Sequence, residues 1–186
     1  MTRAFVMALV GAESTGKTTL AEGLAIAIAA RGLRVIRVDE VLREFCARQA
    51  RTPRHDEQEA IAREQSRRIE VAATRAEVVV ADTTALMIAV YSDIVFADPS
   101  LYCVGEVAQR ACDLTLLTAL DLPWKADGLQ RDGAHVQGSV DARLRAALVR
   151  AGVRPESVAG SGSARSVAAL AAFDRAYAEV RHDRPA

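Results

Sequence analysis

The stretch from Gly11 to Thr18 constrains this chain more than any other, because it reads GAESTGKT and matches the phosphate-binding pattern G-x-x-x-x-G-K-[ST]. A short apolar run over residues 5–10 precedes it and is typical of a buried parallel strand. Residues 18–30, which follow, have the composition of a buried helix. A strand that turns through glycines into a helix directs backbone N–H groups and the positive end of the helix dipole at one point, which suits a phosphate anion. A glycine turn that only connects two elements would not require Lys and Thr after its second glycine, so we expect a nucleotide site.

Two side chains of this loop have specific predicted roles. Lys17 supplies a cation for the β- and γ-phosphates, and the hydroxyl of Thr18 can ligate Mg²⁺. The predicted cofactors are therefore ATP and Mg²⁺. The residues expected to hold the nucleotide are Gly11, Glu13, Ser14, Thr15, Gly16, Lys17, Thr18 and Thr19.

Composition narrows the class of protein. The chain has 186 residues, enough for one domain with a sizeable core, and its formal net charge of +0 gives no electrostatic case for binding nucleic acid or a membrane surface. Its 3 cysteines form no C-x-x-C pair, which favours reduced thiols and a cytoplasmic location. No apolar stretch reaches the roughly 18 residues of a membrane span, and no secretory leader is recognisable. We expect a small-molecule partner, while the oligomeric state stays open.

Apolar runs alternate with helical patterns along the whole chain. The predicted strands cover 5–10, 33–38, 78–81 and 114–118, and a fifth at 153–158 is restricted to a sheet edge by Pro155. The predicted helices cover 18–30, 41–50, 56–76, 85–96, 98–112, 140–151 and 164–180. This alternation predicts an α/β fold in three layers, with a parallel five-stranded sheet between helices. We expect residues 1–186 to form a single domain, with a loop or lid at about 121–137.

Polar residues stand where the predicted strands end, which is where parallel α/β sheets bind ligands. Asp82 ends the third strand, in the position of the carboxylate that helps to hold Mg²⁺ beside a P-loop, often through water. In the alternative interpretation Asp82 is the N-cap of the next helix, a role that Thr83 or Thr84 could equally fill. We predict that Thr18 and Asp82 hold the metal.

Two acids, Asp39 and Glu40, follow the second predicted strand. A carboxylate at this place can bind an acceptor hydroxyl and take its proton during phosphoryl transfer. Glu40 is the first choice and Asp39 the second, and the alternative is that both are acids favoured at a helix start. Arg43, one turn later, could contact a phosphate or form an ion pair with Glu40.

The predicted lid contains the only tryptophan of the chain, Trp124. With Asp127 and Arg131 nearby, it could stack on a flat or cationic ring, or it could anchor the loop to the body of the protein. Arg131 is the predicted lid cation for charge that develops on the transferred phosphoryl group, and the alternative is a solvated surface arginine.

Four motifs, in this order, resemble the ribosylnicotinamide kinase domain of the bacterial multifunctional NAD-biosynthesis regulators. The loop with Glu13 and Ser14 is similar to that family's G-x-E-S-[ST]-G-K-[ST]-T-L. Residues 40–44 resemble its E-Y-x-R-[DE], and residues 80–83 resemble its strand end [IV]-D-T. Residues 123–129, which read PWKADGL, are similar to its P-W-x-A-D-G-[LI]-R.

The resemblance implies a P-loop kinase fold and ATP-dependent phosphorylation of the ribose 5′-hydroxyl of nicotinamide riboside, which gives nicotinamide mononucleotide. It also implies that Trp124 and Asp127 serve the nucleoside and the lid. The adenylyltransferase and DNA-binding activities of the multifunctional proteins are not implied, because the chain has no room for those domains. Val41 replaces an aromatic residue of the family pattern, and Gln130 replaces its lid arginine, with Arg131 next in the chain.

The sequence is also compatible with two other functions. One is a kinase for another nucleoside or nucleotide, and the other is a P-loop ATPase or regulatory switch with no small acceptor. An acceptor-side carboxylate and a lid with tryptophan favour the kinase. The predicted catalytic residues are Lys17, Glu40, Asp82 and Arg131, and the predicted substrate-binding residues are Asp39, Glu40, Arg43, Trp124 and Asp127.

Overall fold

A computed structural model describes residues 3–125 and 134–183 of the chain. Its strands are β1 (Phe5–Val10), β2 (Val35–Val38), β3 (Val78–Asp82), β4 (Leu114–Thr118) and β5 (Glu156–Val158). Its helices are α1 (Lys17–Ala29), α2 (Val41–Gln49), α3 (Gln58–Ala73), α4 (Ala85–Phe96), α5 (Tyr102–Arg110), α6 (Ala134–Arg150) and α7 (Gly162–Asp183), with a short 3-10 helix, η1 (His55–Glu57), before α3.

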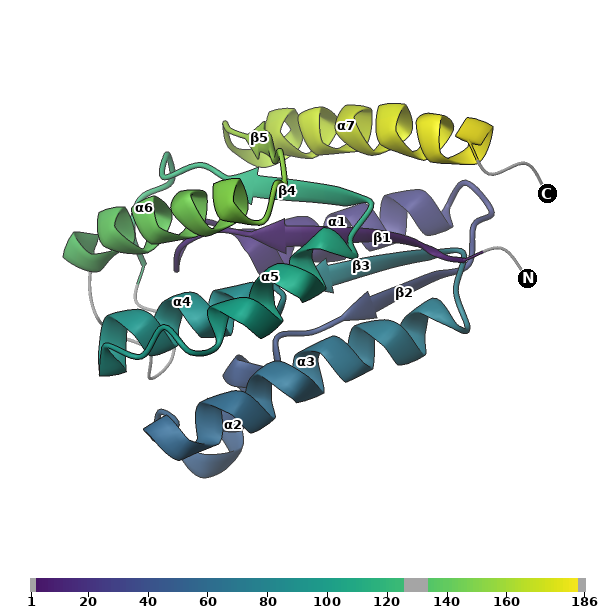
Figure 1. Cartoon of the computed structure of the whole chain (residues 1–186). Helices are drawn as coiled ribbons and strands as arrows, with labels where there is room; N and C mark the ends of the chain where they lie inside the picture. The colour runs from purple at the N-terminus through teal and green to yellow at the C-terminus, as the bar shows by residue number, and fades with distance from the viewer. Residues whose placement is uncertain (1–2, 126–133, 184–186) are drawn as a thin grey trace.

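The strands form one parallel sheet in the order β2-β3-β1-β4-β5 (Figure 1). The central strand β1 is buried along its whole length, as its apolar sequence predicts. The register pairs Leu9 of β1 with Asp82 of β3, so the carboxyl ends of these two strands lie side by side. The predicted parallel sheet is confirmed, and β5 occupies an edge.

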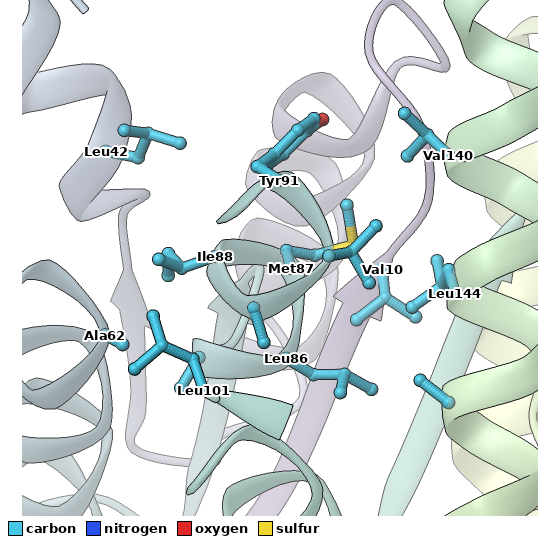
Figure 2. Packing of buried hydrophobic residues seen from close by; sticks show 14 of the residues in the cluster. Val10, Leu42, Ala62, Leu86, Met87, Ile88, Tyr91, Leu101, Val140 and Leu144 are labelled. Atoms are coloured by element: carbon cyan, nitrogen blue, oxygen red, sulfur yellow. The ribbon is translucent and has the colours of Figure 1, made fainter. Parts of the chain in front are cut away.

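Helices cover both faces of this sheet and complete the predicted three layers. On one face, Met7 and Leu9 of β1 belong to the same buried cluster as Leu24 of α1 and Phe173 of α7. On the other face, α4 is buried from Ala85 to Ser92 and lies against α3, α5 and α6. Figure 2 shows Leu86 and Met87 of α4 close to Val10 of β1. Successive residues of β1 therefore contact opposite helical layers, which fixes the register of the strand.

Some predicted boundaries differ from the structure. Helix α6 begins at Ala134 and not at residue 140, so the last residues of the predicted loop 121–137 are helical. The side-chain amide of Gln137 donates to the backbone oxygen of Glu13 at 2.6 Å, a contact between distant segments that local sequence pattern does not report. The predicted helix 56–76 is divided into η1 and α3, and α5 begins at Tyr102 instead of residue 98. In the described part of the chain, no helix combines the length and the apolar character that crossing a membrane requires.

Candidate functional site

The turn after β1 has the backbone that its glycines make possible. Gly11 has a φ of +152°, and a Cβ atom on it would lie 2.1 Å from Oγ1 of Thr118. Gly16, which precedes α1, has a left-handed φ of +76°. Both glycines of the pattern are therefore required by close approach or by backbone conformation.

Side chains from distant elements hold this loop in shape. Thr15 Oγ1 donates to the backbone oxygen of Ala12 at 2.8 Å and lies 2.7 Å from Oγ1 of Thr118, at the end of β4. Arg165 of α7 donates to the backbone oxygen of Thr15 at 3.0 Å and forms an ion pair with Asp121 at 2.9 Å. The loop is thus a braced structure whose shape does not depend on its own sequence alone.

Lys17 is almost enclosed at the start of α1, with 8% of its surface exposed. Its Nζ donates to the backbone oxygen of Ala12 at 2.8 Å. Burial lowers the pKa of its ammonium group, and the negative charges of Glu40 and Asp82 oppose that effect. The structure therefore brings these three predicted catalytic residues within electrostatic range of one another.

The two candidate acids after β2 have different surroundings. Glu40 is buried, with 7% of its surface exposed, and burial raises the pKa of its carboxyl group while Lys17 opposes the rise. Arg43 lies on the exposed side, with its Nε 3.4 Å from Glu40. Asp39 is half-exposed and forms an ion pair with Arg37 at 2.9 Å. Of the two acids, Glu40 is the one that faces the buried charges at the strand ends.

Asp82 is enclosed at the end of β3, with 1% of its surface exposed. Its Oδ1 has no hydrogen-bond partner among the described residues. The interpretation of Asp82 as a helix cap is wrong, because the cap of α4 is Thr84, whose hydroxyl accepts from the backbone N–H of Leu86 at 3.3 Å. A carboxylate oxygen without a partner beside a P-loop suits Mg²⁺, which prefers oxygen ligands, and the predicted second ligand, Thr18, lies in the first turn of α1.

The residue after Asp82 is strained. Thr83 has a left-handed φ of 73°, which is rare for a β-branched side chain. Its backbone N–H donates to the backbone oxygen of Leu9 at 3.0 Å, while its hydroxyl is buried without a partner in the described part of the chain. Two consecutive residues at the end of β3 therefore carry enclosed oxygens that no described group satisfies.

The structure describes only part of the predicted lid. Asp127 and Arg131 lie outside the described residues, so their predicted roles stay predictions. Trp124 is partly buried, and the backbone N–H of its neighbour Lys125 donates to the hydroxyl of Ser14 at 2.7 Å. Together with the bond from Gln137 to Glu13, this ties the chain on each side of residues 126–133 to the Glu-Ser pair of the P-loop.

Three residues that bear on the site were missed at the sequence level: Gln65, Thr118 and Arg165. A polar residue between Ile61 and Ile69 on the apolar face of α3 was the available signal for Gln65. No local signal distinguished Thr118 or Arg165. Within residues 3–125 and 134–183, His, Cys, Asp and Glu side chains form no cluster of three or more that could hold a metal ion.

The chain is similar to known nucleotide-binding proteins. A family model described as AAA domain matches residues 6–165. The crystal structure of NadR protein in complex with NR has a TM-score of 0.76 and 18% sequence identity, over 92% of this chain and 50% of that chain. NadR protein in complex with NAD and AMP-PNP has a TM-score of 0.72 and 18% identity, over 92% and 49%. No curated protein sequence matches the chain.

A thymidylate kinase from Ehrlichia chaffeensis is also similar, with a TM-score of 0.66 and 11% identity, over 94% of this chain and 99% of that chain. The chain spans about half the length of the two NadR chains. At these identities the likeness concerns the fold, and it confirms the predicted P-loop kinase fold. The predicted resemblance to the kinase-containing NadR proteins is confirmed at the level of the fold, because NadR structures are among the similar ones.

Proposed function

This chain belongs to the AAA domain family, and from that premise we propose that it is an ATP-dependent kinase that phosphorylates the ribose 5′-hydroxyl of nicotinamide riboside, giving nicotinamide mononucleotide. The observation that carries the proposal is the buried group of Lys17, Glu40 and Asp82 at the carboxyl ends of β1, β2 and β3. It combines a phosphate-binding lysine, an acid for the metal and an acid for the acceptor. The likeness to NadR in complex with NR supports this choice of acceptor.

On the donor side, the loop from Gly11 to Thr18 would hold the phosphates of ATP. Lys17 would exchange its bond to the backbone oxygen of Ala12 for bonds to the β- and γ-phosphates. Thr18 and Asp82 would hold Mg²⁺, which supplies charge neutralisation for the phosphates when bound. Enclosure of these groups strengthens their electrostatic effect on charge that develops during transfer.

On the acceptor side, Glu40 would accept the proton of the ribose 5′-hydroxyl while the oxygen of that hydroxyl bonds to the γ-phosphorus. The bond from that phosphorus to the β–γ bridging oxygen breaks, and ADP leaves. Arg43 and Asp39 would contact the acceptor. The predicted lid residues Trp124, Asp127 and Arg131 would cover the nucleoside and the transferred group.

We also propose that the described elements form one domain. Helices α1 and α7, from opposite ends of the chain, cover one face of the single sheet, while α3 to α6 cover the other (Figure 1). No described element has a separate core of its own.

Two other functions compete with this proposal. A kinase for another nucleoside or nucleotide is favoured by the likeness to thymidylate kinase, which extends over 99% of that chain. An ATPase or regulatory switch would use the same P-loop without a small acceptor.

The deciding experiment is a panel of nucleosides and nucleoside monophosphates with ATP and Mg²⁺, in which ADP and the phosphorylated acceptor are both quantified. We expect nicotinamide riboside to be turned over fastest, with one ADP formed per phosphorylated nucleoside. Fastest turnover of another acceptor would replace nicotinamide riboside in the proposal. ADP formation at the same rate without any acceptor would favour the ATPase and overturn the kinase.

A further inference from the structure

Gln65, in the middle of α3, holds the backbone on both sides of Glu40. Its Oε1 accepts from the backbone N–H of Val41 at 2.8 Å, and its Nε2 donates to the backbone oxygen of Asp39 at 3.4 Å. Its exposed surface is 0%. A buried amide group from another helix is therefore directed at the two peptide groups that flank the proposed acceptor-side acid.

This arrangement satisfies one of the free backbone N–H groups at the start of α2 from outside the helix. Glu40 is the residue at the N-cap position of α2, but its side chain makes no capping hydrogen bond. A carboxylate at that position ordinarily accepts from the backbone N–H of the second or third residue of its helix. Here Gln65 accepts from Val41, the first residue of the helix. The carboxyl group of Glu40 makes no capping bond and instead lies near Lys17 and Asp82.

We propose that Gln65 is a positioning residue for the acceptor side of the site: from α3 it holds the two peptide groups that flank Glu40, and so keeps the carboxyl group of Glu40 near Lys17 and Asp82. This proposal depends on the proposed function in one respect, namely that Glu40 is the proton acceptor. The geometry requires both halves of the amide, because one peptide group offers a donor and the other an acceptor.

The main test compares Gln65→Met, which keeps the length of the side chain and removes both hydrogen bonds, with Gln109→Met as a matched control. Gln109 is also 0% exposed and also uses both ends of its amide, from Nε2 to Thr115 at 2.8 Å and from Thr84 to its Oε1 at 2.6 Å. Both variants should melt a few degrees below the wild-type protein. A structural role alone would make their enzymatic properties alike.

For Gln65→Met we expect kcat to fall by about 10-fold to 100-fold, as for a misplaced catalytic group, while the Kd for ATP with Mg²⁺ stays within about twofold of wild type. The acid limb of the kcat profile should move, because the surroundings of Glu40 change. For Gln109→Met, kcat and the acid limb should match those of the wild-type protein. A Gln65→Met variant that resembles Gln109→Met in every readout would overturn the proposal.

Two further measurements keep the test decisive. If Gln65→Met does not fold, Gln65→Glu replaces it, since the carboxylate keeps an acceptor for Val41 and loses the donor to Asp39; its added negative charge should move the acid limb to higher pH. The carboxyl carbon of Glu40 can also be titrated by NMR in wild type and variant. That titration needs no turnover, so it separates the two proposals: an unchanged Glu40 titration overturns the role of Gln65, whereas an inactive wild-type protein overturns the kinase.

Discussion

Two turns follow the carboxyl ends of the neighbouring strands β1 and β3. They differ in whether their buried polar side chains have hydrogen-bond partners. In the turn after β1, the hydroxyl of Thr15 bonds to Ala12 and lies against Thr118, and glycines occupy φ values of +152° and +76°. In the turn after β3, a left-handed φ of 73° falls on Thr83, whose hydroxyl is enclosed without a described partner. Each turn therefore has one non-glycine residue with a left-handed φ, since Ser14 in the first turn has a φ of 56°. The difference lies in the buried side-chain oxygens: those of the first turn have partners, whereas those of Asp82 and Thr83 at the second have none among the described residues.

The difference indicates separate roles for the two turns. A buried hydroxyl without a partner costs about 1–3 kcal/mol, and of the two turns only the one after β3 has such a hydroxyl among the described residues. A left-handed conformation costs a non-glycine residue about 1–2 kcal/mol, and that cost is present in both turns, at Ser14 and at Thr83. Strain of this kind persists where the surrounding structure imposes it, and it clusters at ligand sites. We infer that the P-loop is a preformed scaffold, while the end of β3 is arranged for a ligand.

The largest expected effect is that of Lys17→Ala. It tests whether the P-loop keeps its fold when the side chain needed for phosphoryl transfer is removed. Phosphoryl transfer should fall by at least about 100-fold to 1,000-fold, because the substitution removes the ammonium group that would contact the β- and γ-phosphates. The fold should survive, since burial already disfavours the charge of Lys17. Melting temperature and turnover are the measurements, and a variant with full activity would contradict the assignment.

Glu40→Gln should reduce kcat by about 100-fold or more, because the proton acceptor is lost. It should also change how stability depends on pH. Burial raises the pKa of Glu40 above the ordinary value of 4.5, so the folded state binds the proton more tightly than the unfolded state. Wild-type stability should therefore fall as the pH rises from about 4.5 through the raised pKa, and the variant should lack that component.

Thermal melts of wild type and Glu40→Gln across this pH range measure the effect. The advantage of the variant should be larger at pH 8 than at pH 4.5. Asp39→Asn serves for comparison, and we expect its kcat to fall less than that of Glu40→Gln, because Asp39 is paired with Arg37. A larger loss in Asp39→Asn would transfer the role of base to Asp39.

Gly11→Ala tests the close packing of the scaffold. The added Cβ would lie 2.1 Å from Oγ1 of Thr118 and 3.2 Å from its backbone oxygen, so we expect a loss of about 1–3 kcal/mol and weaker nucleotide binding. Gly23→Ala in α1 is the control, because nothing lies within 4 Å of its added Cβ, and it should be neutral or slightly stabilising. Urea unfolding of both variants gives the comparison, and equal stabilities would show that the loop is not braced by Thr118.

The contrast between the two turns also separates the features that the sequence predicts from those that it does not. The P-loop pattern identified Gly11 and Lys17 because each position has a chemical requirement of its own, and apolar runs located the strand ends that carry Glu40 and Asp82. Whether the buried polar atoms of each turn find hydrogen-bond partners depends on residues far along the chain. Thr118 and Arg165 reach the P-loop from β4 and α7, so their roles follow only from the packing of those elements.

The smallest expected effect is also the most direct test, because one substitution made in both turns should change stability in opposite directions. Thr15→Val removes a hydroxyl that is bonded to Ala12 and next to Thr118, so it should destabilise the protein by about 1 kcal/mol. Thr83→Val removes a hydroxyl without a described partner and keeps the shape of the side chain, so it should stabilise by about 1 kcal/mol.

Activity gives the second half of this test. If the end of β3 is arranged for a ligand, the more stable Thr83→Val should transfer phosphate more slowly than wild type, which is the trade-off expected of a strained functional site. Thr83→Ser, which keeps the hydroxyl, should retain more activity than Thr83→Val although it loses a buried methyl group. Urea unfolding and steady-state rates measure both properties. A Thr83→Val variant that is less stable than wild type would remove the distinction between the two turns, because its hydroxyl would then make a stabilising contact of the same kind as that of Thr15.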